Sequence, residues 1–278
     1  MSIETTNDIV KALGNNSSRI IIDKASLANQ TAGRYCSLWR ATGQPGQGAI
    51  PTAAAIPTSA TLGTMGFANQ TDPAKSYLAY AFVANGNATS TVEIHDRLAH
   101  CGGLVLNSTA LQTTNLPINL ETLGVAADRI GSDDFSDVQW WLEVYADGGA
   151  TASNATINVT YNDNSTGNLT VLAVGGTLRI GNMLGLDILR PAADNGKNIK
   201  GINSVTLSAS TGTAGNFGFT CSRPRATLPT VVANKMEIFD WAQLGFSSIP
   251  NNAALTPIIL PTTTSSGTLR GGGKIAHG

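Results

Sequence analysis

Polar and apolar residues alternate along much of the chain, and this alternation predicts β-strands rather than helices. Ile157, Val159 and Tyr161 alternate with Thr and Asn residues, the two-residue period of a strand with one wet face. Clusters of Gly and Asn separate such segments and predict turns, one of them over residues 84–88. The other segments that the pattern predicts as strands are residues 19–23, 76–83, 91–95, 205–209 and 217–221.

Residues 138–174 have the strongest pattern and predict consecutive strands of one antiparallel sheet. The first of these strands is unusual, because Trp140, Leu142 and Val144 lie on one face while Trp141 and Tyr145 lie on the other. A strand with two apolar faces is either central in a sandwich or in contact with a second partner. The sequence leaves both possibilities open.

Few helices are expected. Thr5 or Thr6 can cap a short helix that runs through Leu13 and ends at Gly14, and residues 233–244 have helical spacing of apolar side chains before a glycine. The Ser-Asp-Asp run at 132–134 predicts the cap of a single helical turn.

These elements predict a mainly β protein with three segments. Residues 1–74 form an irregular, extended N-terminal region, residues 75–222 an antiparallel β-sandwich or jelly-roll-like core, and residues 223–278 a C-terminal extension. Residues 251–278 are rich in Pro, Thr and Gly, which predicts an arm that orders only when docked on a partner. We therefore expect the core to fold without residues 245–278.

Composition narrows the classes of partner. Hydrophobic residues make up 42% of the 278 residues, but charged residues only 13%, about half the usual ~25%. Such a neutral surface is typical of a protein that contacts other protein over much of its area, although an ordinary all-β protein would also fit. The net charge of −1 gives no basic excess for nucleic acid, and no apolar run is long enough for a membrane span. Three widely spaced cysteines and an N-terminus without an apolar core predict synthesis in a reducing cytoplasm without a signal peptide.

Side chains capable of chemistry are sparse. His95, His100 and Cys101 could contribute to a zinc site, but the two histidines point to opposite faces of a continuous strand, which favours structural roles. Asp133, Asp134 and neighbouring Asp137 could bind calcium, although capping is the simpler interpretation. The sequence predicts no catalytic residue, cofactor or metal ion, and hence no enzyme.

Three segments together resemble structural proteins of tailed-bacteriophage virions: residues 33–43, 93–104 and 139–151, with residues 205–218 similar to the last core strands of the same group. The resemblance implies a head-associated protein that is assembled in the host bacterial cytoplasm and located in the virion. It implies capsid cement or decoration, with the major capsid protein and further copies of itself, as a homo-dimer or homo-trimer, as partners. The alternative that it leaves open is a neck, tail or fibre component that binds carbohydrate or a receptor.

Aromatic and apolar side chains without an evident local core predict the protein–protein interface. The eight residues are Tyr35, Leu38, Trp39, Trp141, Tyr145, Ile258, Ile259 and Leu260.

Overall fold

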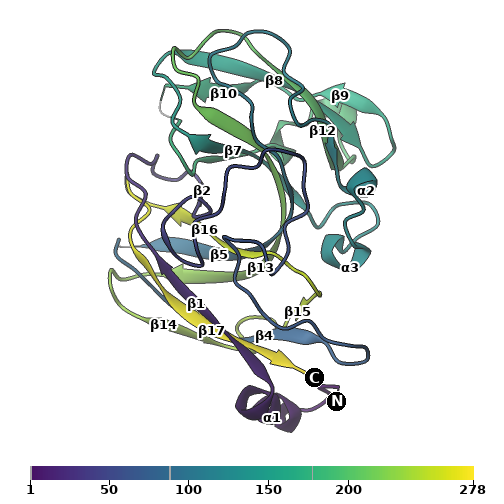
Figure 1. Ribbon diagram of the computed structural model, residues 1–278, viewed down its shortest axis with the longest axis vertical. Helices are drawn as coiled ribbons and strands as arrows, with labels where there is room; N and C mark the ends of the chain where they lie inside the picture. The colour runs from purple at the N-terminus through teal and green to yellow at the C-terminus, as the bar shows by residue number, and fades with distance from the viewer. Residues whose placement is uncertain (1, 88, 177) are drawn as a thin grey trace.

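Three antiparallel sheets are stacked along the long axis of the molecule (Figure 1). The structure is a computed structural model that describes residues 2–87, 89–176 and 178–278. It confirms a mainly β fold with antiparallel sheets and short helices. The turn predicted over residues 84–88 ends on Ala88, which lies outside the described residues.

The sheets are named here by one strand each. The β1 sheet has the order β14 (Glu237–Asp240), β4 (Ser76–Asn85), β17 (Leu269–His277), β1 (Ser17–Lys24) and β3 (Gly43–Gln44), with β15 (Ser248–Ile249) also beside β4. The β5 sheet has the order β11 (Met183–Gly185), β7 (Gln139–Ala146), β13 (Asn216–Thr230), β5 (Ser90–His100), β16 (Leu255–Pro261) and β2 (Cys36–Ser37). The β8 sheet has the order β10 (Leu172–Gly175), β8 (Ala152–Tyr161), β12 (Ile199–Leu207) and β6 (Ile118–Asn119), with β9 (Thr166–Asn168) beside β8. The helical segments are α1 (Thr6–Asn15), α2 (Leu120–Leu123), α3 (Ala127–Ile130) and the 3-10 turns η1 (Asp187–Leu189) and η2 (Ala192–Asp194).

Two hydrophobic cores share the long strands β5 and β13. Val92 and Ile94 of β5 pack in a core with the β1 sheet, whereas Leu98 and Ala99 of the same strand pack in a second core with the β8 sheet. β13 divides in the same way: Phe217–Cys221 contributes to the core with the β8 sheet, and Ala226–Leu228 contributes to the core with the β1 sheet. The β5 sheet is therefore the common layer. We call the region where β5 and β13 pass from one core to the other, at residues 95–97 and 222–225, the waist.

Residues 138–174 do not form one sheet as predicted. β7 belongs to the β5 sheet and β8 to the β8 sheet, and the glycine pair Gly148-Gly149 lies in the connection that carries the chain from one layer to the other. The two apolar faces of β7 are explained by its central place: Trp140 lies in the core shared with the β8 sheet, and Trp141 packs on the other side against Met183 and Ile258. Alternation identified the strands but not their pairing.

The C-terminal segment is not an arm. β16 lies between β5 and β2, and β17 lies between β4 and β1, so both strands are internal to their sheets. The prediction failed because β17 contains three consecutive glycines, which remove the alternating side chains that mark a strand. Their lack of a side chain is needed here, since a Cβ on Gly271 or Gly273 would come within 2.2 Å of a carbonyl oxygen of β4. The division into domains at residues 74 and 222 stays a prediction, but a core without residues 245–278 would lack two inner strands.

The predicted N-terminal helix is confirmed as α1. The Thr5 hydroxyl accepts a hydrogen bond from the Asp8 amide, and the Asp8 carboxylate accepts one from the Thr5 amide, which completes a capping box. The predicted helix over 233–244 is wrong, because residues 237–240 pair with β4 as strand β14. Residues 132–134 lie in turns rather than at the start of a helix.

Candidate functional site

The chemically capable side chains gather at the waist, on β5 and β13. His95, Asp96 and Arg97 stand between the two core segments of β5, and Ser222 and Arg225 hold the matching place on β13. The strands are out of regular register there, with shifts after Cys221 and after Pro224. Such irregularities turn side chains toward a different face, so the same strand pair can serve both cores.

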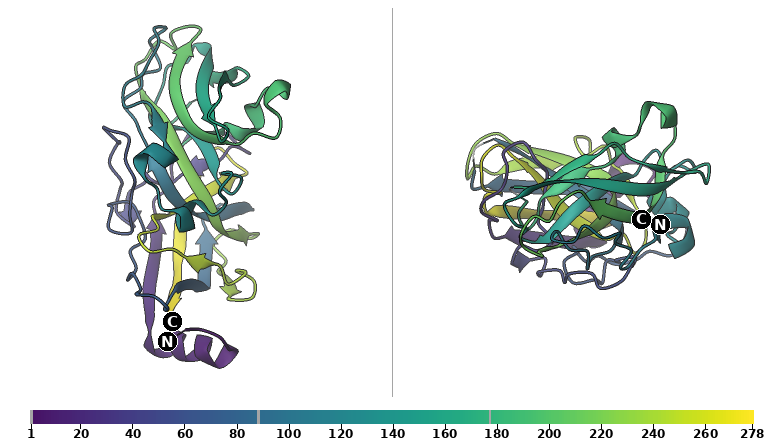
Figure 2. Two further views of the ribbon diagram at one scale, coloured as in Figure 1. Left: turned by 90° about the vertical axis from the view of Figure 1, so that its right-hand side faces the viewer. Right: turned by 90° about the horizontal axis from the view of Figure 1, so that it is seen from above.

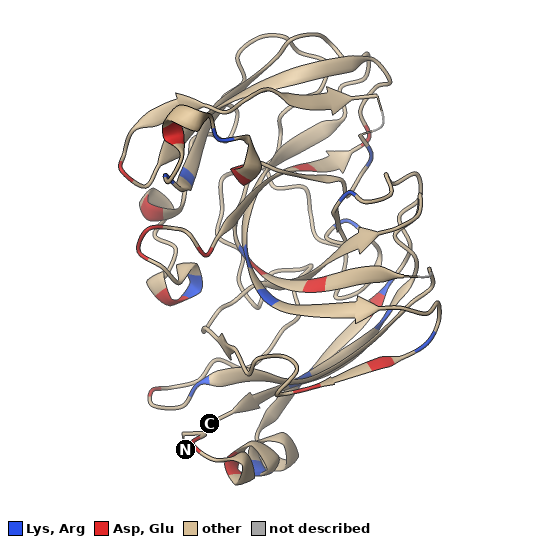
Figure 3. Ribbon diagram, turned by 180° about the vertical axis from the view of Figure 1, so that it is seen from behind, with Lys and Arg blue, Asp and Glu red and all other residues tan. Residues whose placement is uncertain are grey.

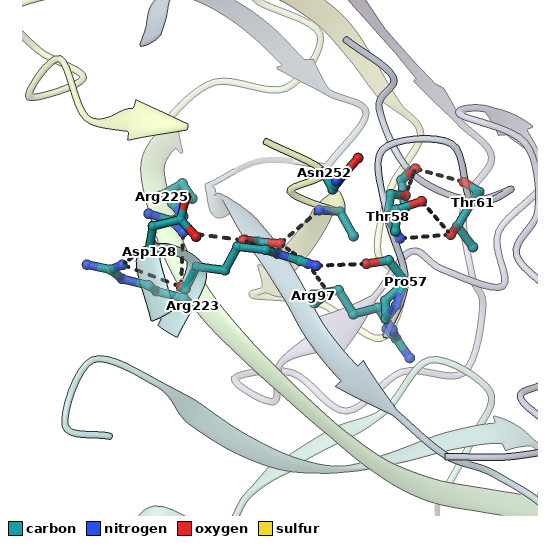
Figure 4. Close-up of polar contacts among 12 residues, drawn as sticks. Pro57, Thr58, Thr61, Arg97, Asp128, Arg223, Arg225 and Asn252 are labelled. Atoms are coloured by element: carbon teal, nitrogen blue, oxygen red, sulfur yellow. Dashed lines mark hydrogen bonds and ion pairs between the residues drawn. The ribbon is translucent and has the colours of Figure 1, made fainter. Parts of the chain in front are cut away.

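Asp96 is the centre of the first half of this network, and Figure 4 labels Arg225 and Pro57, two of the residues that the network includes. Its fully buried carboxylate accepts two hydrogen bonds from Arg129 of α3, at 2.6 and 3.1 Å, and one from Arg225 at 3.3 Å. The backbone amide of Ala254 donates a further bond at 2.8 Å. Arg129 also donates to the carbonyl of Pro57, so one side chain connects α3, β5 and the N-terminal region.

Arg97 is the centre of the second half. Its guanidinium donates to both carboxylate oxygens of Glu143 on β7, with a shortest distance of 2.6 Å, and to the hydroxyls of Tyr145 and Thr220. The ring of Trp39 lies 4.5 Å from the guanidinium carbon, a cation–π contact. These bonds satisfy a buried charge that would otherwise be costly to remove from water.

The protonation state of His100 follows from its bond to Arg97. Arg97 Nε donates to His100 Nδ1 at 2.9 Å, so that nitrogen must be the unprotonated one. Burial, and to a smaller extent the charge of Arg97, hold the pKa of His100 well below its usual value. His100 is therefore a neutral acceptor within the network.

Glu93, His95 and Ser222 have the order of groups found in a nucleophilic triad. His95 bonds to Glu93 at 2.7 Å and to Ser222 Oγ at 2.9 Å. However, Ser222 is only 1% exposed, and its Oγ already accepts a hydrogen bond from the indole of Trp141 at 3.0 Å. A substrate carbonyl cannot reach that oxygen, so the arrangement joins strands rather than supplying a nucleophile.

Other candidate nucleophiles are also enclosed. Burial raises the pKa of the Cys101 thiol to about 12 and also raises the pKa of Cys36 and of Cys221, so none carries thiolate at neutral pH. Among the described residues, no group of three or more His, Cys, Asp or Glu side chains is placed to hold a metal ion. Asp137, considered above for calcium, instead pairs with Arg223 at 2.8 Å.

Most of the predicted interface residues lie inside the chain. Buried are Leu38, Trp39, Trp141, Tyr145, Ile258 and Ile259. The structure brings Tyr35, Trp141 and Ile258 together, with the Tyr35 and Trp141 rings 5.1 Å apart, whereas Trp39 and Tyr145 belong to the Arg97 network. Their own neighbours explain their apolar character, so the reason for assigning them to an interface no longer holds. Tyr35 and Leu260 are half-buried, and for these two the interface role stays a prediction.

Sequence reasoning missed Arg129 and Arg225, which complete the network around Asp96. Arg129 lies 33 residues from Asp96 along the chain, and Arg225 lies 129 residues away. The one available signal was the run 95–97, which begins at the last residue of the predicted strand 91–95, because a charge that continues a buried strand requires a partner.

Comparisons with known proteins give distant capsid structures. No family model and no curated protein matches the sequence. The solved structures that it is similar to include infectious bursal disease virus Gt strain, at 10% identity, with 94% of this chain and 82% of that chain covered and a TM-score of 0.17. The Gx strain of the same virus is 9% identical, with 95% of this chain and 82% of that chain covered and a TM-score of 0.19. The VP2 subviral particle is 10% identical, with 94% of this chain and 80% of that chain covered and a TM-score of 0.17. Such low TM-scores carry no conclusion about fold or function.

None of the helices in the described part of the chain has the length and apolar character needed to cross a bilayer.

Proposed function

We propose that this chain is a non-enzymatic structural protein of a virus particle that binds the major capsid lattice as a cement or decoration protein. The observation that carries the proposal is that the chemically capable side chains are buried and form hydrogen bonds within the chain. Asp96, Arg97, His95 and Glu143 bond to one another or to neighbouring strands across the waist, and none of the four is accessible to a substrate. A network of this kind holds neighbouring strands of the common β5 sheet, α3 and the N-terminal region together, which is a structural use of these side chains.

The surface and the sequence resemblance support the same proposal. Charged residues are few and scattered over the ribbon in Figure 3, which leaves a neutral exterior suited to contact with other protein. The segments at 33–43, 93–104 and 139–151, which resemble tailed-phage virion proteins, build β2, much of β5 and all of β7. The resemblance therefore falls on the common layer of the fold.

The structure changes how such a protein would bind. The C-terminal strands β16 and β17 lie within the sheets, so attachment through a C-terminal clamp is not part of the proposal. Contact with the lattice and with other copies must instead use exposed faces. Assembly in a bacterial cytoplasm and location in the virion belong to the proposal as well.

Copy number in purified particles tests the proposal. Quantitative mass spectrometry should give a ratio to the major capsid protein near one, or a simple large fraction of it. A handful of copies per particle would refute the lattice role in favour of the neck, tail or fibre alternative. Complete absence from particles would refute the virion assignment.

A further inference from the structure

The outer face of the β1 sheet carries an apolar row that the chain leaves uncovered. Strand register places Ile238 beside Phe82, Phe82 beside Gly272, and Gly272 beside Ile21, so the row crosses four strands. Ile238 is 59% exposed and Ile21 49%, whereas the alternate residues Ile20 and Ile22 are buried in the core. Phe82 lies over Gly272, since a Cβ on that glycine would meet its ring at 3.2 Å.

The chain already uses one end of this face for packing. Ala12 of α1 rests against Ala79 and Ala276, and Lys274 donates a hydrogen bond to the Leu13 carbonyl at the end of that helix. The strands β1, β17 and β4 lie side by side with α1 at their end in the left view of Figure 2. The face beyond α1, which holds the apolar row, remains open to solvent.

Charges beside the apolar row are arranged in a self-complementary order. The next row across the strands is Asp240, Tyr80, Lys274 and Arg19, with the acid on β14 and the bases on β17 and β1. Neither Arg19 nor Asp240 forms an ion pair with any residue of the described ranges. A nucleic acid or an anionic lipid surface would require one sign of charge across the face, which this row does not supply.

We propose that a second copy of this chain stacks on this face about a two-fold axis parallel to the strands. This axis exchanges β14 with β1 and β4 with β17. Ile238 then faces Ile21 of the second copy, Phe82 faces Gly272, and Asp240 faces Arg19. A two-fold axis perpendicular to the strands would place Lys274 opposite Arg270 but also Arg19 opposite Asp23 of the second copy, so that repulsive and attractive pairs offset, whereas the strand-parallel axis brings together only opposite charges.

The size of the face sets the expected strength. The two rows described above and the next one, which holds Ala84, Arg270 and Asp23, lie about 6.8 Å apart, and with four strands about 4.8 Å apart they cover roughly 400 Å² per copy. A standard stable interface buries about 800 Å² per partner, so the isolated dimer should be weak. Many copies held side by side on a particle would strengthen it by avidity. The inference concerns a property of the purified chain and does not depend on the proposed virion function.

Sedimentation equilibrium of the purified chain, from about 1 μM to about 500 μM, tests the inference. We expect a concentration-dependent dimer that Ile238→Lys weakens about tenfold or more, because it places a charge against the apolar Ile21 side chain of the second copy. Ile188→Lys is the matched control, since Ile188 is 87% exposed on η1, outside the β1 sheet, and we expect no effect. A chain that stays monomeric throughout, or a dimer that tolerates Ile238→Lys, overturns the inference.

A charge cycle identifies the symmetry. Asp240→Asn keeps the oxygen that accepts bonds from the Ala242 and Gln243 amides but removes the charge. We expect Arg19→Gln and Asp240→Asn each to weaken the dimer about tenfold, because each variant removes two facing pairs. The double variant should be no weaker than either single variant. Additive effects overturn the strand-parallel axis, and both conservative variants remain informative if Ile238→Lys fails to fold.

Discussion

Removing one member of the Arg97–Glu143 pair should destabilise the protein far more than removing both. The two side chains are 2% and 1% exposed, and their shortest distance is 2.6 Å. Glu143→Leu leaves the Arg97 charge buried without its carboxylate, and Arg97→Met leaves the Glu143 charge buried without its guanidinium. Each should lower the free energy of unfolding by about 3–5 kcal/mol. The double variant fills similar volume with apolar groups and should stay within about 2 kcal/mol of the native chain.

Urea unfolding measures these differences, followed by tryptophan fluorescence and far-UV circular dichroism on the same samples. Agreement of the two probes supports two-state treatment of the free energies. The matched control is the Asp23–Arg270 pair, which is 3.6 Å long and largely exposed, and its loss should cost under about 1 kcal/mol. The reasoning is refuted if Glu143→Leu costs no more than the control, or if the double variant costs the sum of the single ones.

Three further outcomes follow from the positions of particular groups. A chain that ends at Leu244 loses the inner strands β16 and β17 and should show no cooperative unfolding transition by circular dichroism. A cooperative transition would contradict the internal placement of these two strands. The three cysteines should resist a thiol-specific chromogenic reagent in the folded chain at pH 8 and all react in urea, and fast reaction in the folded chain would show that they are accessible. Burial lowers the pKa of Lys24 from 10.5 to about 8, so the unfolded chain binds this proton more tightly than the native chain does. As the pH rises from 8 to 10.5, the native chain should therefore gain stability relative to the Lys24→Met variant. Parallel pH profiles of the two chains would contradict that burial effect.

Local patterns in the sequence determined the fold class and several elements. The burial of β8 alternates strictly along Ala152–Tyr161, and the same alternation is visible in the order of its residues. The Thr5–Asp8 capping box of α1 is also local, since both partners lie within one helical turn. Such features depend on neighbours along the chain, and the sequence displays those directly.

Pairing and burial were decided only by the tertiary structure. Nothing near Gly271 shows that β17 will lie between β4 and β1, because its stabilising contacts come from strands about 190 and 250 residues earlier in the chain. In the same way, Asp96 is fully buried because Arg129 and Arg225 reach it from distant segments. Sequence patterns report which side chains an element presents, whereas the partner that each side chain meets depends on how the whole chain packs. For that reason six of the eight predicted interface residues lie buried in the chain, and an exposed face of the β1 sheet became the candidate contact surface.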